Sequence, residues 1–318
     1  MKKKELTIVI GMMMSGSLAA QSVEKAKEQE ENHVEQENIE NMGEMKVWGT
    51  KVQSSSLNIN EEDITIRQAD HLSDLLRSLP GVDVGGAHSL NQRINIRGLD
   101  DKDLAITIDG AVQNTYMYHH AGNLQIHADI LKAVEVQVGT NSVVNGGLGG
   151  AVRFETKEAK DLLEYGQQFG GRIQGSFADN DSTGASMSVF GQLSDNMDFL
   201  GYYNYVDRGN YTVGGGKITG KDGVVINETG EVKGLAGRTN DALIKLGWDI
   251  SPLQRIEFGV ESYNDAGKYS FRPDMGLATD IAIADNMGLP LTYPTEFARD
   301  TYTLNHEVDL GESTILKT

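Results

Sequence analysis

The chain has 318 residues, no cysteine and a formal net charge of −18. The acidic charge argues against nucleic acid as a partner, and the lack of cysteine excludes stabilisation by disulfides. No segment after the N-terminus approaches the roughly 20 apolar residues of a membrane-spanning helix, so we expect no such helix.

The N-terminal residues have the pattern of a secretory signal peptide. A basic start at residues 2–4 precedes an apolar run at residues 6–14, which is too short to span a bilayer, and small residues follow. We therefore expect residues 1–19 to be cleaved on export. Residues 20–44 are rich in Glu, Gln and Asn and predict a disordered acidic tether, with a solvated helix as the alternative.

A short β-prone segment follows this tether. From its residues alone it is either the first strand of a folded domain or an exposed peptide that pairs with a partner by strand addition. The segment consists of Met45, Lys46, Val47, Trp48, Gly49 and Thr50.

Residues 70–79 are predicted to form a helix that leads into a strand. Leucines recur there at helical spacing, and Pro80 and Gly81 end the helix. Val82 and Val84, on either side of Asp83, begin the strand. Two further β-prone strings follow, INIRGL at residues 94–99 and ITIDGAVQN at residues 106–114.

Residues 131–156 combine two predicted strands with a glycine-rich turn. Val134, Val136 and Val138 alternate with polar residues, and glycines at 146, 147, 149 and 150 precede a second strand at residues 151–156. A phosphate-binding loop is excluded because no Gly-Lys-Ser/Thr follows and the glycines lead into a strand.

Taken in order, DLLRSLPGVDV, INIRGL, ITIDGAVQN and the VEVQVG to GGLGGAVRFET stretch resemble the plug domain of TonB-dependent outer-membrane receptors. The resemblance implies an α/β plug domain at residues 51–157, a linker at residues 158–169 and a location in the outer membrane of a Gram-negative bacterium. It implies a transporter and not an enzyme. We also find no nucleophile with a base and no paired carboxylate site in the sequence.

The resemblance also assigns roles to particular residues. It makes residues 45–50 a TonB box, the segment that pairs with a TonB-type energy-coupling protein. Plug arginines equivalent to Arg93 and Arg97 tend to pair with barrel carboxylates in this family, which implies a lock between plug and barrel. The alternative is that both arginines lie on the surface of a small strand.

Residues 170–318 have the pattern of a partial antiparallel transmembrane β-barrel in contact with lipid. Segments of alternating hydrophobicity are separated by short turns near residues 195 and 252 and by long polar links at residues 209–239 and 265–300. A soluble β-sandwich would instead have a polar outward face. About six or seven strands fit, against about 22 in plugged transporters, so we expect an incomplete barrel and a fragment that is not transport-competent alone.

Within the family, the string GGAVRFETKEAKDLLEYGQ at residues 149–167 is most similar to receptors for heme or for heme from hemoglobin. Those receptors carry a heme-ligating histidine between the IDG strand and the VEV strand. The corresponding interval here contains Tyr116, Tyr118, His119 and His120.

His120 matches the position of that histidine best, which makes it the predicted ligand of heme iron, with His119 as the fallback. A neutral imidazole suits ferric heme as an axial ligand, and a tyrosine phenolate is a known alternative. Two other interpretations stay open: the histidines decorate a surface, or they bind another iron chelate. A ferric siderophore receptor is therefore the alternative function, and His127 is expected to be structural.

Overall fold

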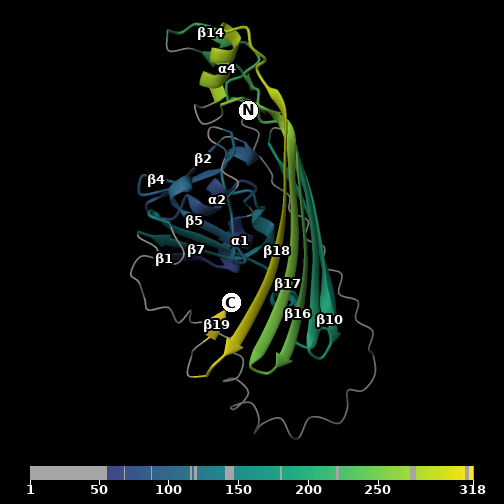
Figure 1. The fold of residues 1–318 in the computed structure, drawn as a ribbon. Helices are drawn as coiled ribbons and strands as arrows, with labels where there is room; N and C mark the ends of the chain where they lie inside the picture. Colours follow the sequence, from purple (N-terminus) through teal and green to yellow (C-terminus); the bar gives the residue numbers. More distant parts are fainter. Residues whose placement is uncertain are drawn as a thin grey trace, which may run out of the picture.

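The computed structural model describes residues 56–67, 69–86, 88–114, 117, 120–139, 147–179, 181–219, 222–272, 277–311 and 315–317. The predicted signal peptide, tether and TonB box lie outside the described residues, as do Tyr116, Tyr118 and His119. Residues 56–163 form a mixed α/β unit, which we call the plug. It lies against one face of a long curved antiparallel sheet, which we call the wall (Figure 1).

The plug contains a five-stranded sheet of order β1-β7-β8-β5-β6 and a three-stranded sheet of order β2-β3-β4. Short helices cover these sheets, and their side chains share one apolar core. The elements are β1 (Ser56–Ile59), α1 (Glu61–Arg67), α2 (Leu72–Leu76), β2 (Val82–Gly85), β3 (Arg93–Ile96), β4 (Leu99–Asp100), β5 (Ala105–Ile108), β6 (Ala111–Val112), β7 (Leu131–Val138), β8 (Gly150–Thr156) and α3 (Ala159–Leu162).

The predicted helix at residues 70–79 is present but shorter. It begins after His71, whose imidazole accepts a hydrogen bond from the backbone N–H of Ser73, and it ends at Leu76. The predicted leucines at positions 72, 75 and 76 are buried in the core. Gly81 has a φ of 77°, a conformation that favours glycine, and β2 starts at the next residue, as predicted.

The predicted strand pair at residues 131–156 is confirmed as β7 and β8, which are antiparallel with Val134 opposite Phe154. Gly150 shows why the turn between them is rich in glycine. Its φ is 134°, and a Cβ there would lie 2.2 Å from the carbonyl oxygen of Gln137. Only glycine allows the two backbones to approach this closely.

The wall has seven strands in the order β19-β18-β17-β16-β11-β10-β9. Its predicted class, an antiparallel sheet that follows the plug, is confirmed. The strands are β9 (Phe169–Ala178), β10 (Ser182–Ser194), β11 (Met197–Arg208), β16 (Gly237–Ser251), β17 (Gln254–Tyr269), β18 (Tyr293–Asp309) and β19 (Ile315–Lys317).

Two long links, after β11 and after β17, lie at one end of the wall, which we call the long-link end (Figure 1). The turns after β10 and β16 lie at the other, the short-turn end. Small elements occupy the links: β12 (Tyr211–Thr212), β13 (Ile218–Thr219), β14 (Val225–Asn227), β15 (Glu231–Val232) and α4 (Leu277–Asn286). None of the helices in the described ranges is long and apolar enough to cross a membrane.

The wall strands reach further toward the long-link end than the sequence predicts. Residues 265–269 belong to β17 and not to a link, and Tyr269 pairs with Tyr293 at the start of β18. This prediction of the link boundaries was wrong because polar residues occupy both faces in this stretch. Hydrogen bonds to the neighbouring strand continue there, although the alternation of hydrophobicity has stopped.

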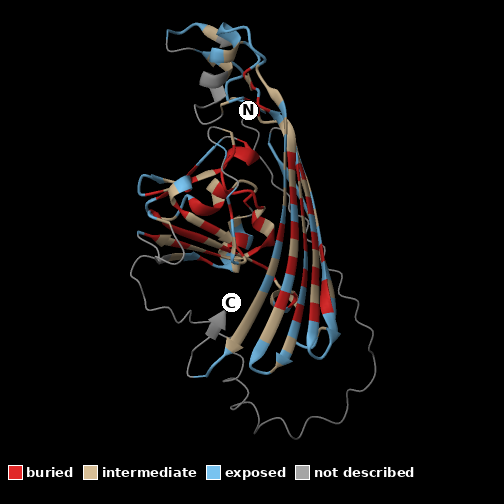
Figure 2. Ribbon diagram, viewed as in Figure 1, coloured by how far each residue is buried: buried red, intermediate tan, exposed pale blue. Residues whose placement is uncertain are grey.

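Buried and exposed residues alternate along the wall strands (Figure 2). The buried ones include charged side chains that contact the plug, so the two faces of the wall have opposite chemistry. On β16, Asp241 and Lys245 are 0% and 3% exposed, whereas Trp248 is 46% exposed; on β18, Leu304 is 69% exposed. A soluble sheet buries its apolar face, so this arrangement excludes the β-sandwich. An apolar outer face is what a sheet in contact with lipid requires.

Candidate functional site

An aromatic cluster lies at the long-link end, where plug and wall meet. The imidazole of His120, on the plug, is 4.8 Å from the ring of Phe271, measured between ring centroids, and Phe271 is 5.5 Å from Tyr293. Phe271 follows the last strand residues of β17, and Tyr293 is the first residue of β18. His120 and Tyr293 are half-exposed and Phe271 is 55% exposed, so the cluster is open to a ligand.

The backbone around His120 is held in a tight turn. The N–H of His120 donates to the carbonyl oxygen of Met117 at 2.8 Å, and Met117 and Ala121 form an isolated β-bridge. Gly122 then passes close to the neighbouring chain, since a Cβ there would lie 1.9 Å from the carbonyl oxygen of Gln92. This packing fixes the position of His120, the predicted ligand of heme iron.

A second ring contact joins plug and wall directly beneath this cluster. His88 stacks on Tyr269 with ring centroids 4.2 Å apart and planes inclined by 14°. The Tyr269 hydroxyl donates to Asp265 at 2.5 Å and lies 3.2 Å from the hydroxyl of Ser89. Burial, with a smaller contribution from the nearby His71, lowers the pKa of His88 to about 3. His88 is therefore a neutral ring at physiological pH, which suits a buried stacking contact.

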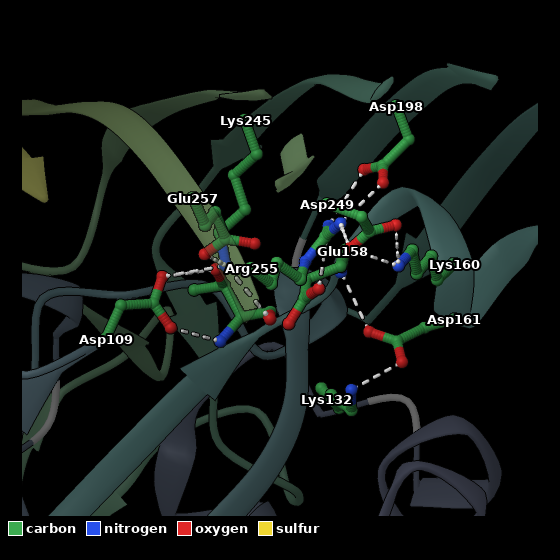
Figure 3. Close-up of polar contacts among 11 residues, drawn as sticks. Asp109, Lys132, Glu158, Lys160, Asp161, Asp198, Lys245, Asp249, Arg255 and Glu257 are labelled. Atoms are coloured by element: carbon green, nitrogen blue, oxygen red, sulfur yellow. Dashed lines mark hydrogen bonds and ion pairs between the residues drawn. The ribbon is translucent and has the colours of Figure 1, made fainter. Parts of the chain in front are cut away.

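Where plug and wall meet, the ammonium of Lys245 on the wall pairs with a plug carboxylate (Figure 3). We call this group of buried ion pairs the lock. The ammonium lies 3.2 Å from Asp109 and 3.0 Å from Glu257, and it donates to the carbonyl oxygen of Thr156 at 3.3 Å. Asp109 has a φ of 47° and accepts hydrogen bonds from the N–H and the hydroxyl of Thr156. The plug turn and the buried wall lysine thus share one hydrogen-bonded unit.

Arg255 extends the same lock toward the short-turn end (Figure 3). Its guanidinium pairs with Asp198 at 2.7 Å and Asp249 at 3.2 Å on the wall, and with Glu158 of the plug at 3.2 Å. Lys160 of the plug pairs with Asp249 at 2.7 Å. Charges on both sides of the interface are therefore compensated, as buried ionic groups require.

Plug carboxylates also pair with wall arginines further along the interface. Asp70 accepts hydrogen bonds from the Arg208 guanidinium, and Asp129 lies 3.3 Å from Arg172. Burial raises the pKa of Asp70, but hydrogen bonds from His127 and Arg208 outweigh it and hold that pKa well below its ordinary value. The His127 imidazole lies 3.7 Å from the Asp70 carboxylate through Nε2 and accepts a hydrogen bond from the backbone N–H of Asp129 through Nδ1, and it is mostly buried. A structural role for His127 stays a prediction.

Arg93 and Arg97, the predicted locking residues, lie on β3 and in the turn that follows it. Arg97 is exposed, has a φ of 50° and donates its backbone N–H to the carbonyl oxygen of Gly81 at 2.8 Å. Arg93 is half-buried, and its charge acts on the plug carboxyl of Asp101. Pairing of these arginines with wall carboxylates stays a prediction. Most of the observed plug–wall pairs join a plug acid to a wall base, and Lys160 with Asp249 is a pair of the opposite sense.

Sequence reasoning missed Phe271, Tyr293 and the Lys245 lock. Lys245 was visible as the charged member of an alternating strand, and Asp109 as part of the ITIDG string, but nothing in their spacing pairs them. Phe271 and Tyr293 fall inside a segment predicted to be a link.

The wall is charged on the face that meets the plug and apolar on the other face. Together with a plug that bears short helices, this arrangement defines a class, the plugged receptors of outer membranes. Residues 49–151 match the family described as TonB-dependent Receptor Plug Domain. These residues belong to the plug-domain family of the TonB-dependent receptors, which are transporters and not enzymes and are located in the outer membrane of Gram-negative bacteria.

Relatives with assigned names include heme receptors. The chain is 30% identical over 249 residues to the heme transporter BhuA of Brucella suis, an alignment that covers 77% of this chain and 34% of BhuA. It is 34% identical over 202 residues to the heme/hemopexin utilization protein C of Haemophilus influenzae, covering 62% of this chain and 26% of that protein. The chain thus spans about a third or less of the length of these relatives.

Solved structures confirm the fold. The FrpB iron transporter of Neisseria meningitidis superposes with a TM-score of 0.68 at 23% identity, over 81% of this chain and 38% of that protein. A ferric enterobactin receptor of Pseudomonas aeruginosa superposes with a TM-score of 0.55 at 22% identity, over 80% of this chain and 38% of the receptor. At these identities the likeness concerns the fold alone.

Proposed function

We propose that the chain acts in TonB-dependent uptake of an iron-containing ligand, and that the ligand is heme or heme taken from hemoglobin. The observation that carries the proposal is the position of His120. It is a half-buried imidazole at the plug surface, in contact with the ring of Phe271, which in turn contacts Tyr293, at the end of the wall where the long links gather. In outer-membrane sheets the longer loops face the outside, where the ligand arrives.

The chemistry of this cluster suits heme. A neutral imidazole is a common axial ligand of heme iron, and aromatic rings pack against the flat faces of conjugated ligands. The assigned names of relatives, which include heme transporter and TonB-dependent heme receptor, support the same ligand. His119, Tyr116 and Tyr118 belong to the proposed site by their place in the sequence.

Uptake requires the plug to move. The proposed coupling involves two parts of the chain, the TonB box and the lock between plug and wall. The TonB box at Met45–Thr50 adds as a strand to a TonB-type protein, which transmits force to the plug. The lock of Lys245 and Arg255 keeps the plug seated until that force is applied. Because its charges are buried and compensated, the lock resists spontaneous opening.

The experiment is a hemin titration of the purified chain in detergent micelles, followed through the Soret band. We expect saturable binding by the wild type, loss of the shifted Soret band in His120→Ala and little change in the control His127→Ala. A ferric catecholate siderophore, titrated in parallel, tests the alternative function. Binding of the siderophore with no Soret response to hemin would reject the heme proposal.

A further inference from the structure

We propose that Phe271 and Tyr293 form, with His120, an aromatic platform for a flat conjugated ring, and that this platform rather than the imidazole alone selects the ligand class. Neighbouring rings are inclined by 59° and 53°, so the ligand stacks on one ring and meets the others edge-on. The inference rests on the proposed function and deepens it. It assigns a part of the ligand site to the wall, on residues beyond the plug interval that contains His120.

Phe271 faces the plug and not the lipid. Phe271 lies two residues beyond the end of β17, and its ring contact shows which way it faces. Tyr269 is buried against His88 of the plug, and Phe271 contacts His120 of the plug. The exposed part of the Phe271 ring therefore faces the space above the plug, where a ligand at His120 would lie.

The rings are held in place from below. Tyr269 is fixed by its stack on His88 and by its hydrogen bond to Asp265 at 2.5 Å, and it pairs in the sheet with Tyr293. Phe271 lies two residues beyond this anchor and contacts Tyr293. A platform supported in this way loses little conformational entropy when a ligand binds.

The composition of the cluster indicates the ligand class. Its described members offer a phenyl ring, a phenol ring and an imidazole, and no carboxylate or ammonium takes part in these two ring contacts. Rings of this kind favour a broad, flat π-system over a ligand recognised mainly through charged or hydroxyl groups. A porphyrin meets this requirement with or without its metal, because stacking does not depend on iron.

The experiment uses the full chain in detergent micelles with two probes, hemin and metal-free protoporphyrin IX. Phe271→Leu and Tyr293→Leu keep apolar bulk but remove the ring, whereas Tyr293→Phe keeps it. Phe177→Leu is the matched control, since Phe177 is an exposed phenylalanine of β9, at the far edge of the same sheet. Circular dichroism verifies the fold, and Phe271→Tyr, which retains a ring, provides a second folded reference.

We expect both leucine variants at the platform to weaken both probes by about 3- to 10-fold, with Tyr293→Phe, Phe271→Tyr and Phe177→Leu close to the wild type. His120→Ala should weaken hemin more than protoporphyrin. If the wild type binds both probes and Phe271→Leu binds them equally well, the platform is refuted while heme binding stands. Binding of hemin but not of protoporphyrin also refutes the platform, and binding of neither refutes the heme function itself.

Discussion

Replacement of Lys245 by Met should unlock the plug from the wall. The substitution keeps the length of the side chain but removes the ammonium that Asp109 and Glu257 share at 3.2 and 3.0 Å. The lysine side chain is 4% exposed and both carboxylates are 9% exposed, so the two acids would be left buried without their base. Removing one partner of a buried ion pair costs about 3–5 kcal/mol.

Amide hydrogen exchange of β5 and β8 measures this loss, because Asp109 directly follows β5 and accepts hydrogen bonds from Thr156 at the end of β8. A decrease of about 3–5 kcal/mol in the free energy of local opening raises the exchange rate roughly 150- to 4,000-fold. Lys268→Met is the control, since Lys268 is an exposed lysine of β17. Adding Asp109→Asn and Glu257→Gln to Lys245→Met should restore most of the protection, because no uncompensated charge then remains. Protection in Lys245→Met that differs from the wild type by less than about 0.5 kcal/mol would refute the lock.

Three further predictions concern the plug and the segment before it. Burial and the Asp100 carboxylate raise the pKa of Asp101 from its ordinary 3.8 to about 6. Ionised Asp101 therefore destabilises the fold above pH 6, and this penalty disappears as the pH falls toward 3.8. Asp101→Asn should therefore stabilise the chain at pH 7.5 by on the order of 1–3 kcal/mol but not at pH 4, as melting curves would show; a gain that is equal at both pH values would contradict the assignment. Gly122→Ala should cost about 1–3 kcal/mol and weaken hemin binding, because its Cβ clashes with a carbonyl oxygen, whereas Gly175→Ala, which meets open space, should be neutral in both assays. Deletion of residues 45–50 should abolish co-purification with the periplasmic domain of a TonB protein and leave hemin binding intact; retained co-purification would reject the TonB box.

The sequence predicts those strands in which apolar and polar residues alternate with a period of two. This pattern locates β7 and β8 and the central parts of the wall strands, where one face meets lipid and the other meets charge. The pattern fails where polar residues lie on both faces, as at residues 265–269 of β17, where Asp265 is buried and Lys268 is exposed. Helix α1 was overlooked although a signal was present, since Asn60 accepts a hydrogen bond from the N–H of Asp63 as an N-terminal cap does.

The candidate site is predictable only in part, for a different reason. His120 can be singled out because its position along the chain corresponds to a family motif. Its contact with Phe271, and that of Lys245 with Asp109, join segments far apart in the sequence. Local periodicity contains no information about such pairs.

The central claim, that the plug histidine at the long-link end ligates heme iron, is tested most directly by electron paramagnetic resonance of the ferric hemin complex. We predict a signal with an axial nitrogen ligand in the wild type and its loss in His120→Ala, with the His127→Ala complex unchanged. The same nitrogen-ligated signal in the wild type and in His120→Ala would contradict the account.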